Sequence, residues 1–116
     1  MTEAHAIDPE DRKIIVLARS ARARNGVAEG AAVRDETGRT YVAATVGLPS
    51  LELSALRTAV AMAVASGATS LEAGAVVTEA EALADADLAA VADLGGTTPV
   101  LLAGPDGTVR TTLTAG

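Results

Sequence analysis

The chain has 116 residues, which is enough for one domain with its own hydrophobic core. Hydrophobic residues make up 49% of it, which argues against disorder, and a formal net charge of −6 argues against a nucleic-acid binder. There is no cysteine, which excludes disulfides and thiol chemistry. We also see no apolar run long enough to span a membrane and no signal peptide, and expect a cytoplasmic protein.

The first element predicted is a helix from about residue 9 to residue 22, after a flexible start at residues 1–8. Asp8 is suited to cap it and Pro9 to occupy its first turn, and Asn25-Gly26 should end it. Its apolar side is expected to consist of Ile14, Ile15, Leu17, Ala18 and Ala21.

A β-hairpin should follow, with strands over 30–35 and 39–46 and a turn between them. Gly47-Leu48-Pro49 breaks this pattern, and Ser50 is a candidate cap for a helix over 51–66. That helix has only two charged residues, Glu52 and Arg57, and an apolar surface on nearly every side predicts that it is buried.

The remaining third of the chain predicts alternating strands and one short helix. Asp85 or Asp87 should cap this helix, which ends near Leu94 before a Gly-Gly pair. The other expected elements are a strand over 71–78, a connector over 79–84, a strand over 98–103, a turn over 104–107 and a strand over 108–113.

The predicted elements follow the order α-β-β-α-β-α-β-β. In this order, and over about residues 10–113, several segments resemble the cytidine deaminase family. The first strand carries Glu29-Gly30-Ala31-Ala32, where the family has V-G-A-A. The long helix carries Ser54-Ala55-Leu56-Arg57-Thr58-Ala59, where the family has C-A-E-R-T-A. The family's Asp-Gly turn and Tyr-containing strand, and its late hairpin, match Asp35 to Val42 and Pro99 to Val109. The resemblance implies a single domain over 1–116, with an α/β fold of three layers (α-β-α) around a mixed five-stranded sheet.

The resemblance also implies a zinc site, yet the matching residues do not suit one. Zinc deaminases use one His or Cys and two Cys as ligands, and a Glu carries protons. Ser54 stands at the first ligand position and Leu56 at the position of the Glu. A P-C-x-x-C motif would fall near Ala84 to Leu88, where Asp85 could coordinate a metal and Leu88 could not. For Asp85 and Asp87, helix capping is favoured over a role as metal ligands.

The substrate contacts implied by the resemblance are changed as well. The family's N-x-E, which holds the ribose, matches Ala43 and Thr45 at its two polar positions. Val27 lies near the position where family members have an aromatic residue that packs on the base. Arg57 matches the Arg of C-A-E-R, and we expect it at a subunit contact or in a salt bridge.

Two other groups of residues have simple interpretations. His5 is the only histidine, and we expect it to be solvated in the N-terminal tail. A basic stretch, expected to form a solvated helix face, comprises Arg12, Lys13, Arg19, Arg22 and Arg24.

The function predicted first is that of a non-catalytic cytidine deaminase-like protein, acting as an oligomeric structural or binding module without a metal or another cofactor. Because family members are typically homotetramers, a tetramer is favoured over a dimer. The alternative is a protein that binds a nucleoside or another small ligand in the vestigial pocket. An active cytidine deaminase ranks last. No nucleic-acid or membrane partner is expected.

Overall fold

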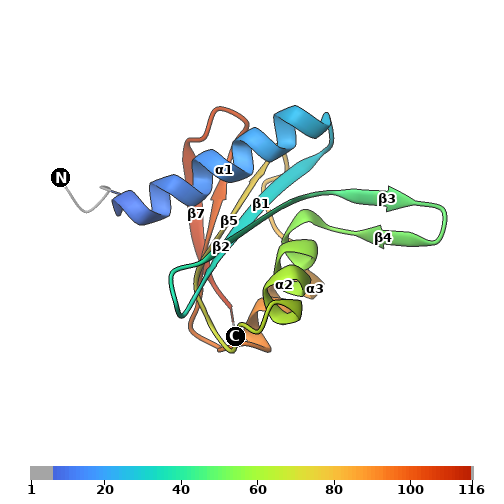
Figure 1. Cartoon of the computed structure of the whole chain (residues 1–116). Helices are drawn as coiled ribbons and strands as arrows, with labels where there is room; N and C mark the ends of the chain where they lie inside the picture. Colours follow the sequence, from blue (N-terminus) through green and yellow to red (C-terminus); the bar gives the residue numbers. More distant parts are fainter. Residues whose placement is uncertain (1–6, 116) are drawn as a thin grey trace.

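The computed structural model describes residues 7–115 and shows one five-stranded sheet with helices on both sides (Figure 1). Most of the segment predicted to be flexible, with His5, lies outside the described residues. Ile7 and Asp8 are described, and both have structural roles. Ile7 packs against the apolar cluster beneath the first helix, and Asp8 caps that helix.

Helix α1 (Pro9–Asn25) begins as the sequence predicts and runs three residues beyond the predicted end. The Asp8 carboxylate accepts a hydrogen bond from the Glu10 amide at 2.8 Å. Gly26 ends the helix with a φ of 63°, a left-handed conformation that glycine adopts without strain. The prediction that Leu17 lies on the buried side is wrong, because 39% of this residue is exposed.

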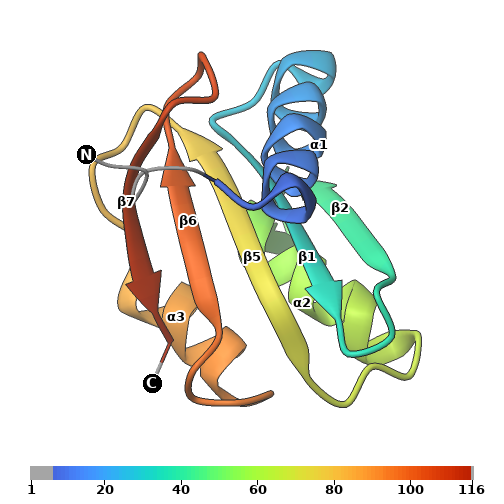
Figure 2. The ribbon, with the colours of Figure 1, turned by 90° about the vertical axis from the view of Figure 1, so that its left-hand side faces the viewer.

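The main sheet is mixed, as the family resemblance implies, with strand order β2-β1-β5-β6-β7. Strands β5 and β6 run parallel, and every other neighbouring pair is antiparallel (Figure 2). The strands are β1 (Glu29–Asp35), β2 (Thr40–Ala44), β5 (Leu71–Thr78), β6 (Pro99–Ala103) and β7 (Val109–Thr114).

Two apolar clusters, one on each face of the sheet, form the core and give the three-layer arrangement. Helix α1 covers one face, where Ile14 and Ile15 pack on small residues of β1, β5 and β6. Helices α2 (Ala55–Ala65) and α3 (Asp85–Ala92) cover the other face, where Leu56 and Val91 are fully buried. The sheet side chains in these clusters are mostly Ala and Val, and such small side chains allow helices to pack close to a sheet.

A second hairpin, which the sequence analysis did not predict, separates β2 from α2. Strands β3 (Val46–Leu48) and β4 (Leu51–Leu53) pair with each other alone and project from the body of the molecule (Figure 1). The prediction of a helix from residue 51 with Ser50 as its cap is therefore wrong. Pro49 and Ser50 form the hairpin turn, and Ser54 caps α2.

The prediction that α2 is buried nearly all round is also wrong. Its sheet-facing side is buried, but Met62 and Val64 on the other side are 41% and 50% exposed. The helix thus presents an apolar face to solvent. No helix within residues 7–115 combines the length and the apolar character needed to cross a membrane.

Candidate functional site

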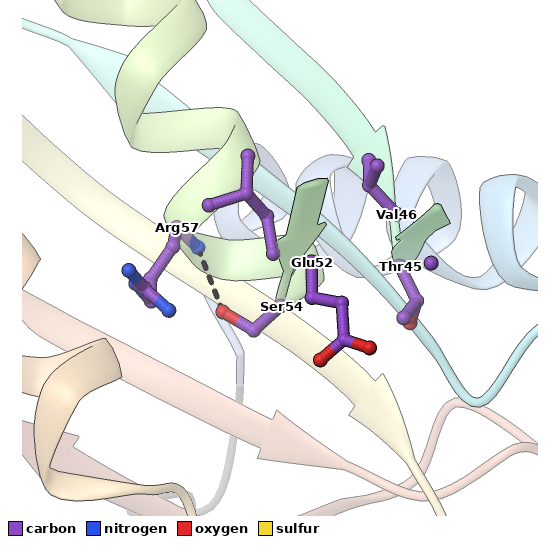
Figure 3. Close-up of a pocket in the computed structure, with 7 residues that line it drawn as sticks. Thr45, Val46, Glu52, Ser54 and Arg57 are labelled. Atoms are coloured by element: carbon purple, nitrogen blue, oxygen red, sulfur yellow. Dashed lines mark hydrogen bonds between the residues drawn. The ribbon is translucent and has the colours of Figure 1, made fainter. Parts of the chain in front are cut away.

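The candidate site lies where the projecting hairpin joins the N-terminus of α2. Ser54 is the N-cap of this helix, and its Oγ accepts a hydrogen bond from the Arg57 amide at 3.2 Å (Figure 3). The same hydroxyl donates to Oδ1 of Asp87 at 2.6 Å. One serine therefore both caps α2 and binds the first turn of α3.

Asp87, which the sequence analysis treated as a candidate helix cap, is the acidic residue that reaches Ser54. It lies in the first turn of α3, and only 4% of it is exposed. The capping prediction for Asp85 and Asp87 is wrong, because Ala84 is the N-cap and no side chain caps this helix. Asp85 is exposed, while the part-buried Leu88 packs against the core on the α2 side.

Glu29, a residue that the sequence analysis did not single out, also faces the start of α2. Its Oε1 accepts a hydrogen bond from the Ala55 amide at 3.4 Å. The backbone amide of Glu29 donates to Oγ1 of Thr45 at 3.1 Å, which places the start of β1 beside the site. A carboxylate near a helix N-terminus is favoured by the helix dipole. The signal in the sequence was an acidic residue where the family pattern has Val.

Two of the expected pocket positions are buried in the core. Leu56 is completely buried, with an exposed fraction of 0%, and packs in the cluster under α2. Ala43 belongs to the same cluster. Val27 lies part-buried in the loop between α1 and β1.

A pocket of about 390 Å³ opens at the base of the hairpin. Of the positions singled out from the sequence, Thr45, Ser54 and Arg57 line it (Figure 3). The other lining residues are Val46, Gly47, Glu52 and Leu53. Glu52 and Arg57 bring opposite charges to the rim, and both residues are exposed. Arg57 forms no salt bridge with another residue of the described range, so its predicted role at a subunit contact stays a prediction.

The side chains around Ser54 do not fit a zinc ion. A catalytic zinc needs three protein ligands with nitrogen, sulfur or carboxylate donors. Within residues 7–115, no three His, Cys, Asp or Glu side chains are grouped closely enough to hold a metal. The Ser54 hydroxyl, a weak ligand in any case, is already bound to Asp87.

The basic stretch on α1 lies away from this pocket, and three of its arginines bind carbonyl groups of the chain itself. Arg12 donates to the Gly107 carbonyl at 3.1 Å, and Arg19 donates to the Pro105 carbonyl at 2.9 Å. Arg22 donates to the Ala28 carbonyl at 3.0 Å. These arginines hold loops against α1, so the interpretation as a purely solvated face is incomplete.

Comparison with known proteins agrees with this fold. A cytidine deaminase from Burkholderia pseudomallei is similar over 100% of this chain and 94% of its own, with a TM-score of 0.78 and 29% identity. A cytidine deaminase from Mycobacterium leprae has a TM-score of 0.69 and 20% identity, over 89% of this chain and 91% of its own. A search of curated proteins found no match. The family model described as cytidine deaminase-like matches residues 7–107, and the chain therefore belongs to the cytidine deaminase-like family.

Proposed function

We propose that this chain is a non-catalytic member of its family and serves as an oligomeric interaction module. The observation that carries the first part is the hydrogen bond between Ser54 and Asp87, at the place where the family resemblance would put a zinc ligand. Two protein groups satisfy each other there, and neither is left to hold a metal.

The absence of a proton carrier supports the same proposal. Hydrolytic deamination needs an activated water and a group that moves protons between the water and the base. Leu56 stands at the position of that group, and its hydrocarbon side chain is buried in the core. None of the three carboxylates of the site lies on the first turn of α2: Glu29 and Glu52 lie on strands, and Asp87 lies on α3, where it accepts a hydrogen bond from Ser54.

Exposed apolar side chains support the second part of the proposal. Leu48 and Leu51 on the hairpin are 55% and 49% exposed, and Met62 and Val64 lie on the outer side of α2. We propose that a second copy of the chain covers these residues, in a tetramer like those typical of the family.

Metal analysis and an activity assay test the non-catalytic part. The purified protein should contain far less than one zinc per chain and release no ammonia from cytidine. Stoichiometric zinc, or ammonia release that a chelator abolishes, would identify the chain as an enzyme. Light scattering tests the assembly, and a clean monomer at micromolar concentration would contradict it.

The pocket at the base of the hairpin favours a second candidate function, small-ligand binding. Its volume of about 390 Å³ is within the range of ligand sites. Glu52 and Arg57 could orient a polar ligand there. A thermal-shift panel of nucleosides and nucleotides tests this: a dose-dependent rise in the unfolding midpoint would support it, and no rise with any compound favours the interaction module.

A further inference from the structure

Helix α3 is intrinsically weak and depends on contacts with the rest of the molecule. It spans only eight residues, Asp85–Ala92, and its N-cap is Ala84, without a side-chain hydrogen bond. Alanine is a poor N-cap, and a helix of about two turns is marginal in isolation. Its position must therefore be fixed from outside.

The contact between Ser54 and Asp87 is suited to that task. It joins residues 33 positions apart at 2.6 Å, and Asp87 is 4% exposed. A hydroxyl that donates to a carboxylate at this distance forms a strong hydrogen bond, and burial shields it from water. Because Ser54 is fixed as the cap of α2, it offers α3 a rigid partner.

Arg110 anchors the segment before α3. Its guanidinium donates to the carbonyls of Thr78, Glu79 and Ala80, at distances between 2.6 and 3.3 Å. The segment from residue 79 to α3 is thus held at its beginning by Arg110 and at the helix by Ser54.

We infer that the hydrogen bond between Ser54 and Asp87 is the structural tie that fixes α3 on the N-terminus of α2, in place of metal coordination. The order of α3 then depends on this pair, together with the apolar contacts of Leu88 and Val91, and not on a bound metal. This inference does not depend on the proposed interaction role, because its test follows the local order of the chain rather than its assembly or activity.

Hydrogen exchange followed by mass spectrometry on the full chain provides the test. Ser54→Asp keeps a good N-cap for α2 but cannot donate to Asp87 and repels it. The amides of α3 should exchange at least about tenfold faster, as expected when a hydrogen bond to a charged group is lost, while α2 keeps its protection. Asp87→Ala, which leaves the Ser54 cap in place, should have the same effect on α3.

The double variant Ser54→Asp with Asp87→Asn reverses the roles of the two positions, because the side-chain amide introduced at position 87 can donate to the carboxylate introduced at position 54. This variant should recover most of the protection of the α3 amides. Asp85→Asn removes an exposed carboxylate from the same turn and is the matched control, with wild-type exchange expected. Wild-type exchange in α3 for both Ser54→Asp and Asp87→Ala would overturn the inference. Faster α3 exchange in the wild-type protein after addition of a chelator would also overturn it.

Discussion

At the scale of single residues, Gly30 lies where the backbone of α1 comes very close to the sheet. A Cβ atom at this position would lie 2.7 Å from the Arg22 amide nitrogen and closer still to the Ala18 carbonyl oxygen. Both are backbone atoms of α1, so no side-chain rotation relieves the clash. In this chain, the close contact with α1 explains why a glycine occupies the second position of the V-G-A-A pattern.

We expect Gly30→Ala to destabilise the fold by about 3 kcal/mol, at the upper end of what overpacking costs, because α1 must move away from β1. Urea unfolding measures the loss. Gly47→Ala is the control, since nothing lies within 4 Å of a Cβ built there, and its stability should change by less than about 0.5 kcal/mol. Equal stability of the two variants would contradict the steric argument.

Asp35 is a buried carboxylate at the turn between β1 and β2, with an exposed fraction of 2%. Burial by itself raises its pKa, but hydrogen bonds from Thr37, Tyr41 and the Arg39 amide outweigh this and lower the pKa to about 2. The phenol of Tyr41, the only aromatic residue, donates one of these bonds at 2.8 Å. The turn is thus organised around one ionised group.

The low pKa of Asp35 predicts a specific dependence of stability on pH. The pKa of an Asp in an unfolded chain is about 3.9, so the folded state binds the proton of Asp35 more weakly than the unfolded state does. The stabilisation is complete above about pH 4 and is lost as the pH falls toward about 2. Urea unfolding of the wild-type protein and of Asp35→Asn across this window should show a difference that shrinks as the pH falls. A constant difference would mean that the charge of Asp35 contributes nothing.

At the scale of elements, the arginines of α1 hold the turn between β6 and β7 against the helix. Arg12 and Arg19 donate to the carbonyls of Gly107 and Pro105, which lie 95 and 86 residues away along the chain. These bonds are partly or fully exposed, so each stabilises the structure only modestly. They nevertheless fix a surface loop that follows the end of β6.

The double variant Arg12→Ala with Arg19→Ala should therefore loosen the turn and cost about 1 kcal/mol of folding stability, because one part-buried and one exposed hydrogen bond to carbonyls are lost. Hydrogen exchange of residues 104–108 should accelerate, and that of α2 should not. Arg24→Ala removes an exposed arginine of the same helix and serves as the control. If Arg24→Ala accelerates exchange in the turn equally, a general charge effect is at work.

Much of this architecture could be predicted from the sequence, because the helix caps, turns and alternating apolar residues act locally. The start of α1 and the bounds of β5 are confirmed. The β3–β4 hairpin was missed because Leu51 and Leu53 fit a strand and a helix equally well over so short a run. Only Ser50 was considered as the cap, whereas the pairing of β4 with β3 moves the start of α2 to Ala55 and makes Ser54 its cap.

The candidate site was less predictable, because its contacts join residues far apart in sequence. Ser54 was singled out from the sequence, but its contact with Asp87 could be identified only after α2 and α3 were placed. Glu29 comes from a third element, and an acidic residue in place of the family's Val does not by itself indicate a contact with the Ala55 amide. Sequence reasoning identified positions that differ from the family pattern, but not the contacts that their side chains make.

At the scale of the whole molecule, exposed apolar side chains lie on more than one surface. The hairpin exposes Leu48 and Leu51, and α2 exposes Met62 and Val64. Helix α1 exposes Val16, at 52%, on the opposite side of the main sheet (Figure 2). The proposed assembly uses the first two surfaces, which are connected along the chain through Ser54, and leaves α1 free.

Substitution of the two hairpin leucines tests whether the subunit contact lies on the hairpin or on α1. Leu48→Ser with Leu51→Ser should reduce the mass of the oligomer, because it removes apolar area that a second copy would cover. The stability of the monomer fold should change by less than about 0.5 kcal/mol, since both side chains are about half exposed without a partner.

Val16→Ser makes the same kind of change on α1 and should leave the assembly intact. Light scattering on the three proteins distinguishes the cases: an unchanged mass for the hairpin variant would contradict this interface, and a reduced mass only for Val16→Ser would place the contact on α1 instead.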